Sequence, residues 1–324
     1  MRIWIVALLA LGLATAAQSQ QPERKRIKLA GITMQEDQFF RLVLFGMRDA
    51  ARKAGVELFE GDTYHQPEKE IELVQTYVSR KVDAILISPL SKKGSVAALK
   101  LAHDKGVCIV SYNTPVDADF LTAAIESSDA NLGQQTGKAA REYIGRRLGG
   151  KAKLAIVAFK SANPEQSAAR VGGFKSEIAR LPGVEIVAEQ DAWLTEMAVK
   201  RVGDILTAHP DVDVIWSANE GGTTGSVLAV KDAGKAGHVV VFGTDASEQL
   251  LAMLQSDDNI LQAITSQRPV EIGRLAVEAA LKSLKGEPTA KETVLPGVLL
   301  SRADPSGVKK FATDFKAWTS QGTR

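Results

Sequence analysis

Short apolar runs alternate with longer amphipathic segments along almost the whole chain. The short runs are rich in β-branched residues, which is typical of buried strands, whereas the longer segments repeat apolar residues at helical spacing. In the first half, the pattern predicts strands at 26–32, 56–59, 82–87, 107–112 and 121–125, and helices near 40–54, 67–80 and 94–105. Strand, helix and strand at this spacing indicate parallel crossovers and a sheet covered on both faces.

The same rhythm begins again after Gly149-Gly150, which ends a helix predicted from about 131 to 148. The second half predicts strands at 153–158, 184–188, 212–217, 239–243 and 261–265, and helices near 166–180, 195–208, 222–233, 246–255 and 270–285. Asp304 and Pro305 begin a last predicted helix over 304–318. We therefore expect an α/β fold of two doubly wound parallel-sheet lobes of similar design.

Residues 1–17 have the pattern of a secretory signal peptide. One early basic residue, Arg2, precedes an apolar run from Ile3 to Leu13, and small residues follow up to Ala17. The run is too short to span a bilayer comfortably, and no later segment is apolar for long enough. We expect cleavage of this segment and a mature protein free in the periplasm, since no cysteine near the cleavage point could carry a lipid.

Composition and charge narrow the classes of partner. The chain has 324 residues, 45% of them hydrophobic, and a formal charge of +2 without a block of like charges, so nucleic acid is not an expected partner. The single cysteine, Cys108, lies in a predicted strand, and we interpret it as a buried thiol. The four histidines are far apart and no triad or phosphate-loop motif stands in a suitable context, so we expect no metal, no cofactor and no catalysis.

Polar residues follow the ends of predicted strands in both halves. In open α/β sheets, ligands bind outside the carboxyl ends of the strands, where loops diverge and helix N-termini offer free donors. The residues at these positions are Thr33, Asp37, Asn113, Thr114, Asn219, Glu220, Asp245 and Gln267. Two lobes whose strand ends face each other would line a cleft with carboxylates and amides.

The stretch TMQEDQFF, residues 33–40, places a carboxylate two residues before a pair of phenylalanines. One interpretation is that both rings open a helix and pack into the core. The other is a sugar site, because carboxylates and amides bind hydroxyl groups while rings stack on the C–H faces of a sugar. Arg170, in SAARVGGF, would add a planar guanidinium with paired donors.

Several segments in order, at matching spacing, resemble the ribose-type periplasmic sugar-binding proteins, the solute-binding components of ABC importers. They are residues 33–40, 83–89 (DAILISP), 167–174 (SAARVGGF), 206–220 (LTAHPDVDVIWSANE), 242–245 (FGTD) and 264–273 (ITSQRPVEIG). The resemblance implies a class I fold with a three-stranded hinge crossed near 125–130, 265–269 and 294–299. It implies a first lobe of 26–127 plus 268–296 and a second lobe of 128–267 plus 297–320.

The resemblance carries ligand contacts onto residues of both lobes and the hinge. They are Thr33, Asp37, Phe39 and Phe40 in the first lobe, Arg170, Trp193, Asn219 and Asp245 in the second, and Gln267 at the hinge. Trp193 could equally be a packing residue at the start of a helix. We interpret Tyr112 and Trp216 as core residues because both lie in predicted strands.

One position departs from the pattern of the family. Sugar binders of this group usually show Asp-Arg after the fourth strand, whereas this chain has Asn113-Thr114 and so loses a charged acceptor and a bidentate donor. Asp37, where the family commonly has an amide, would restore one carboxylate. Facing only Arg170, the carboxylates favour a neutral or cationic ligand over an anionic one, and we expect a neutral sugar or polyol.

The leading hypothesis is a monomeric receptor that closes over its ligand and delivers it to an inner-membrane ABC permease. A second hypothesis keeps the same fold but has the liganded form contact a membrane sensor kinase or chemoreceptor. A third is an exported enzyme on the same scaffold, which would alter a bound molecule over time.

Overall fold

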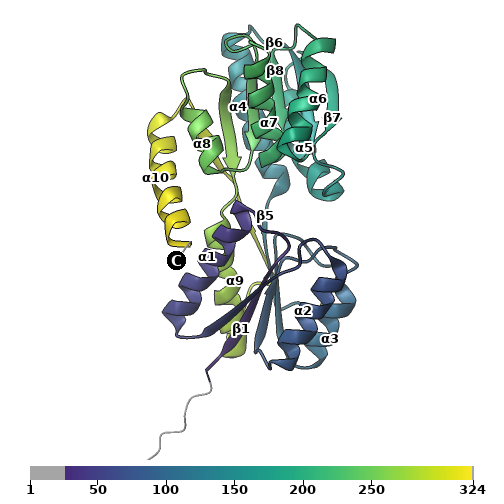
Figure 1. Ribbon diagram of the computed structural model, residues 1–324, viewed down its shortest axis with the longest axis vertical. Helices are drawn as coiled ribbons and strands as arrows, with labels where there is room; N and C mark the ends of the chain where they lie inside the picture. Colours follow the sequence, from purple (N-terminus) through teal and green to yellow (C-terminus); the bar gives the residue numbers. More distant parts are fainter. Residues whose placement is uncertain (1–25, 323–324) are drawn as a thin grey trace, which may run out of the picture.

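The computed structural model describes residues 26–322, so the signal peptide predicted over 1–17 lies outside the described residues. Figure 1 shows two lobes stacked along the long axis, each with a central sheet flanked by helices. Each sheet has six strands, ordered β11-β5-β4-β3-β1-β2 in the first lobe and β12-β10-β9-β8-β6-β7 in the second. The two doubly wound α/β lobes predicted from the periodicity are thus confirmed.

The first lobe consists of a parallel sheet with a pair of helices on each face. Its strands are β1 (Lys28–Thr33), β2 (Glu57–Asp62), β3 (Ala84–Ile87), β4 (Cys108–Tyr112), β5 (Ala123–Ser127) and β11 (Glu292–Leu295), and its helices are α1 (Gln38–Ala54), α2 (Pro67–Ser79), α3 (Val96–Asp104) and α9 (Pro269–Leu284). All five strand pairs are parallel. One core cluster joins α1 and α9 to the sheet, and another joins α2 and α3 to its opposite face.

The second lobe repeats this plan. Its strands are β6 (Lys151–Ala158), β7 (Gly183–Asp191), β8 (Val214–Ser217), β9 (Val240–Thr244), β10 (Leu261–Ser266) and β12 (Val298–Ser301), and its helices are α4 (Asp129–Arg147), α5 (Pro164–Ile178), α6 (Thr195–Ala208), α7 (Glu220–Asp232), α8 (Glu248–Gln255) and α10 (Pro305–Gly322). β12 pairs antiparallel with β10, whereas the other pairs are parallel. α4 and α5 pack on one face, and α6, α7 and α8 on the other.

The chain passes between the two sheets three times. The passages lie between β5 and α4, between β10 and α9, and between β11 and β12. We propose domain limits of 26–127 plus 268–296 and 128–267 plus 297–320 on this basis.

Most element boundaries differ from the predicted ones by one to three residues, but β11 and β12 were not predicted as strands. Both are four residues long, and Val294 and Leu299 within them are 49% and 38% exposed, so neither forms the buried apolar run that marks a strand. No described helix is both long and apolar enough to cross a membrane.

Candidate functional site

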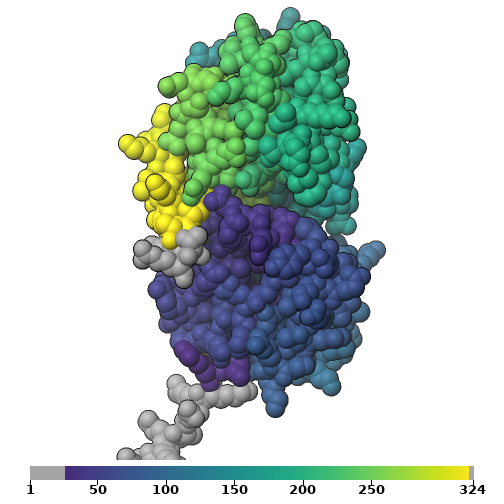
Figure 2. All heavy atoms as spheres, in the orientation of Figure 1, coloured from purple at the N-terminus to yellow at the C-terminus, as the bar shows by residue number. Residues whose placement is uncertain are grey.

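A cavity of about 460 Å³ lies between the lobes, at the carboxyl ends of the strands of both sheets. Figure 2 shows the two lobes in contact at this level. The lining residues are Met34, Gln35, Asp37, Phe39, Phe40, Leu42, His65 and Asn113 from the first lobe, Phe159, Ser161, Ala162, Asn163, Gln166, Arg170, Trp193, Asn219, Glu220, Asp245 and Ala246 from the second, and Ser266, Gln267 and Pro269 from the passage between them.

The start of helix α1 positions the acid and the two rings. The Asp37 carboxylate caps the helix by accepting a hydrogen bond from the Phe40 backbone N–H at 2.9 Å. The helix then directs Phe39 and Phe40 together, with their rings edge to face and centroids 5.0 Å apart. Phe40 is 3% exposed and contributes to the core of the first lobe, yet both rings line the cavity. The two phenylalanines thus combine both alternatives that the sequence left open: they pack at the start of a helix and they line the cavity.

Arg170 forms the centre of the second wall. Its guanidinium donates to Asp129 Oδ1 at 2.7 Å, to the Ala218 carbonyl at 3.0 Å and to Asp245 Oδ2 at 3.2 Å. The guanidinium carbon also lies 5.1 Å from the centroid of the Phe159 ring, which is the geometry of a cation–π contact. Because the side chain is 4% exposed, these partners hold the charge of Arg170 in a fixed position.

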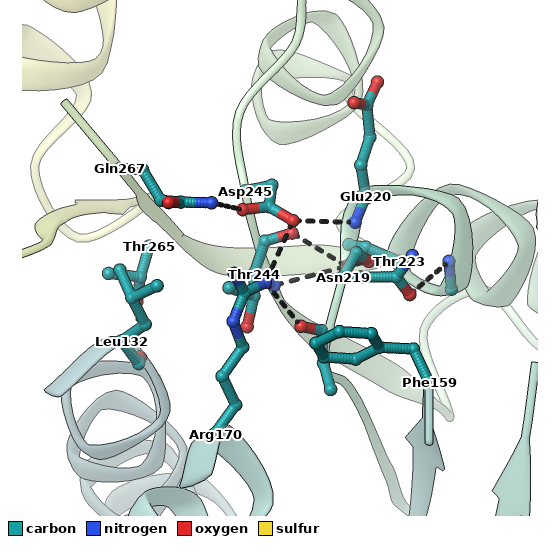
Figure 3. Close-up of polar contacts among 12 residues, drawn as sticks. Leu132, Phe159, Arg170, Asn219, Glu220, Thr223, Thr244, Asp245, Thr265 and Gln267 are labelled. Carbon is teal, nitrogen blue, oxygen red and sulfur yellow. Dashed lines mark hydrogen bonds and ion pairs between the residues drawn. The ribbon is translucent and has the colours of Figure 1, made fainter. Parts of the chain in front are cut away.

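Asp245 links the strand ends of the second lobe, as the dashed lines in Figure 3 show. One carboxylate oxygen accepts from the Glu220 backbone N–H at 3.1 Å as well as from Arg170, and the other accepts from Gln267 Nε2 at 2.9 Å. Asp245 has φ +70°, and Asn113 at the end of β4 has φ +64°. Asp and Asn tolerate this left-handed conformation better than other side chains do, and here it turns the backbone at two strand ends that face the cavity.

Asn219 holds the aromatic part of this wall. Its side-chain oxygen caps α7 by accepting from the Gly222 N–H at 3.1 Å, and its side-chain nitrogen donates to the Trp193 carbonyl at 2.8 Å. Asn219 therefore connects the start of α7 to the loop that carries the Trp193 ring into the cavity.

Burial sets the protonation of the carboxyl groups. It raises the pKa of Asp37, against hydrogen bonds from Phe40 and Gln35, and it raises the pKa of Glu220 to about 7, with further repulsion from Asp245 and Asp37. Burial also raises the pKa of Asp129, although Arg170 acts in the opposite direction. Burial alone would lower the pKa of Arg170, but Asp245 and Asp129 outweigh this effect and raise it.

Comparison with known proteins assigns the chain to a family. The family described as periplasmic binding protein domain matches residues 31–288. The chain belongs to this family.

Relatives of this binding protein cover almost its whole length. The ABC transporter periplasmic-binding protein YphF of Escherichia coli K12 is 25% identical over 313 residues, which are 94% of this chain and 95% of that protein. The ribose import binding protein RbsB of the same organism is 28% identical over 281 residues, 86% of this chain and 91% of that protein. A periplasmic solute-binding protein from Actinobacillus succinogenes 130z, solved with bound D-allose, superimposes with a TM-score of 0.80 at 25% identity, covering 87% of this chain and 100% of that one.

Ten of the twelve residues that the sequence singled out in this binding protein line the cavity between the lobes. These are Asp37, Phe39, Phe40, Asn113, Arg170, Trp193, Asn219, Glu220, Asp245 and Gln267. Thr33 and Thr114 are not among the lining residues. Both are buried, and the Thr33 hydroxyl donates to Asp62 Oδ2 at 2.6 Å within the first lobe. Tyr112 and Trp216 are core residues, as the sequence predicts.

Sequence reasoning missed several residues that line the cavity or pair with its lining residues. Phe159 directly follows β6, so the strand-end rule could have found it. Gln166 donates to the Asn113 carbonyl across the two lobes at 3.2 Å, a contact without any local signal. Asp129, the closest partner of Arg170, looks in the sequence like an ordinary acidic residue in the first turn of a helix. His65 lines the cavity, although we interpreted the histidines only as poor metal ligands.

Proposed function

We propose that this protein captures a sugar or polyol in the periplasm by closing its two lobes, and delivers it to an inner-membrane ABC permease. One observation carries the proposal: side chains from both sets of strand ends line a single cavity, with rings and hydrogen-bonding groups on both walls. Rings match the C–H faces of a hydroxyl-rich molecule, and carboxylates, amides and a guanidinium match its hydroxyls. The relatives named above are binding proteins, which supports a role without catalysis.

Closure fits the contacts between the lobes. Besides the contact between Gln166 and Asn113, the side-chain oxygen of Gln38 accepts a hydrogen bond from the Glu248 backbone N–H at 3.3 Å. Residues of both lobes thus meet around the cavity, so a ligand there would contact both walls at once. Such a ligand binds the closed arrangement more tightly than the open one and therefore shifts the hinge equilibrium.

The remaining parts of the proposal concern export and assembly. We propose that residues 1–17 are removed as a signal peptide and that the mature protein is monomeric. Delivery to an importer is preferred over a sensor kinase because the relatives include a component of a ribose importer.

Direct titration against sugars and polyols by isothermal calorimetry tests this function. We expect saturable binding of at least one compound, and about tenfold weaker binding by Trp193→Ala, which removes a ring from the wall. Phe120→Ala is the matched control because the Phe120 ring packs on His103 in the first lobe and does not line the cavity. Absence of binding to every compound, or equal affinity of Trp193→Ala and the wild type, would contradict the proposal.

A further inference from the structure

The negative charges of the side chains that line the cavity outnumber the positive ones. Three carboxylates, those of Asp37, Glu220 and Asp245, face one guanidinium, that of Arg170. A fourth carboxylate, Asp129, lies behind the wall and also pairs with Arg170. The site therefore carries an excess of negative charge that its own lining cation does not neutralise.

Arg170 is already engaged and cannot neutralise the rest of the wall. It pairs with Asp129 at 2.7 Å and with Asp245 at 3.2 Å, and it is 4% exposed. In Figure 3 the Glu220 side chain extends away from Arg170, with only its backbone nitrogen joined to Asp245. The two carboxylates that remain, Asp37 and Glu220, come from opposite lobes.

Neither of these carboxylates forms an ion pair within the described part of the chain. Asp37 accepts hydrogen bonds from the Phe40 N–H and the Gln35 side chain, and Glu220 is hydrogen-bonded to the Ser247 side chain. Arg41 is the one cation that influences both, and its effect on each is smaller than the repulsion from Asp245. Arg41 is itself exposed, so solvent screens it.

Closing the lobes therefore brings carboxylates together across the cavity, where burial and repulsion make the charged form costly and raise the pKa of Glu220 to about 7. This cost opposes closure unless a positive group lies between the carboxylates. A ligand ammonium has three N–H donors and no acceptor, so it suits two carboxylates that have free oxygen lone pairs. The same group would contact both lobes only when they are closed, and so it would favour closure more than a hydroxyl in the same place.

We propose that the natural ligand is an amine-bearing sugar or polyol, whose ammonium lies between Asp37 and Glu220 and whose hydroxyls bind the rest of the wall. The inference depends on the proposed function and narrows it, since the sequence alone favours a fully neutral ligand. Asp37 and Glu220 then determine specificity, while Arg170, Asn219 and Asp245 bind hydroxyl groups.

Calorimetric titration with matched pairs tests the inference. The pairs are D-glucosamine with D-glucose, D-galactosamine with D-galactose, and D-mannosamine with D-mannose, at pH 7. We expect at least one amine to bind about tenfold or more tightly than its hydroxyl twin, and Asp37→Asn and Glu220→Gln to abolish most of that preference. Asn at position 37 keeps the helix cap. Glu165→Gln, an exposed residue of α5 outside the wall, is the control and should keep the preference.

The outcomes distinguish failure of this inference from failure of the proposed function. If a hydroxyl sugar binds and its amine twin binds equally or more weakly in every pair, the inference is wrong and the proposed function stands. If no member of any pair binds, the result counts against both.

A measurement without ligand tests the premise that the carboxylates of Asp37 and Glu220 oppose closure of the lobes. Small-angle X-ray scattering should show a smaller radius of gyration for the Asp37→Asn, Glu220→Gln double variant than for the wild type, because the neutral wall no longer opposes closure. An unchanged radius would show that these carboxylates do not resist closure, and the inference would fail.

Discussion

Arg170 shows how one residue can hold a site together. The buried guanidinium compensates two carboxylates, Asp129 and Asp245, and its remaining contacts are the Ala218 carbonyl and the Phe159 ring. Removing the cation would leave both carboxylates buried without compensation, which is the costly way to break an ion pair.

We therefore expect Arg170→Met to lower the free energy of unfolding by about 3–5 kcal/mol, measured by urea denaturation. The control is Lys175→Met on the same helix, since Lys175 pairs with Glu189 at 2.6 Å but both side chains are 40% exposed. That surface pair contributes below about 1 kcal/mol. Similar losses for the two variants would show that Arg170 does not stabilise the lobe through its buried pairs.

Glu126 and Glu220 predict a pH dependence of stability. Burial raises the pKa of both from 4.5 to about 7, and Glu292 on the neighbouring strand adds to the effect at Glu126. Between pH 4.5 and pH 7 the folded state holds more protons at these sites than the unfolded state does. The free energy of unfolding should therefore fall as the pH rises through this window.

The Glu126→Gln, Glu220→Gln double variant should show a smaller decrease in the free energy of unfolding between pH 4.5 and pH 7. Urea denaturation at several pH values measures this decrease. Gln at these positions stays neutral throughout. Glu185→Gln, at an exposed position of β7, should retain the wild-type slope. A double variant with the wild-type slope would assign the pH dependence to other groups.

At the scale of elements, close helix crossings position the two walls. A methyl group at Gly133 of α4 would lie 1.9 Å from the Arg170 carbonyl oxygen of α5, and one at Gly173 of α5 would lie 2.1 Å from the Ala130 oxygen. The first lobe repeats this contact, with Gly46 of α1 against the Val270 oxygen of α9. Without side chains at these points the helices approach closely, and the crossing of α4 and α5 brings Asp129 to Arg170.

Gly133→Ala should force α4 and α5 apart and lower stability by about 1–3 kcal/mol, with weaker ligand binding because Arg170 shifts. Gly172→Ala on α5 is the matched control, since a methyl group there meets no atom within 4 Å in the described structure. That change should stabilise the helix by about 0.5–1 kcal/mol. Thermal denaturation distinguishes the two variants, since the melting temperature should fall for Gly133→Ala and rise for Gly172→Ala. Changes in the same direction would show that the close contact between α4 and α5 does not require glycine at position 133.

At the scale of the whole molecule, α10 connects the two lobes. It follows β12 of the second lobe, packs on α8 and β12, and reaches α1 of the first lobe, as Figure 1 shows. Phe315 of α10 and Leu42 of α1 are 1% and 2% exposed and belong to one core cluster with second-lobe residues. Opening the hinge would disturb this cluster, so α10 should favour the closed arrangement.

Truncation that removes residues 315–324, and with them Phe315, should therefore increase the radius of gyration without ligand and weaken ligand affinity. Small-angle scattering and calorimetry measure the two effects. Lys310→Ala, an exposed change on the same helix, is expected to alter neither. A truncated protein with the wild-type scattering curve would show that α10 does not influence closure.

The strands and helices could be predicted because their signals are local. Ala84–Ile87 and Val214–Ser217 are buried along their whole length, and each begins with at least three consecutive apolar residues. β11 and β12 could not be found in this way, because their half-exposed side chains carry no such run and their pairing partners, β5 and β10, are distant in the chain.

The site was predicted in part for the same reason. Asp245 directly follows β9, and Asn219 and Asp37 stand two and four residues after β8 and β1, so the strand-end rule applies to each one separately. Gln166 and Asp129 matter only through partners on other elements, Asn113 and Arg170, so no local pattern marks them.

The sequence by itself determined two α/β lobes, a set of polar residues after the strands and residue types suited to binding a sugar. These features could be recognised because hydrophobic periodicity and residue type are properties of short stretches of chain. Only the tertiary structure decided that Arg170 is already paired and that Asp37 and Glu220, from opposite lobes, line the same cavity. Electrostatic interactions depend on distance in space, and folding sets that distance between residues that are far apart in the chain.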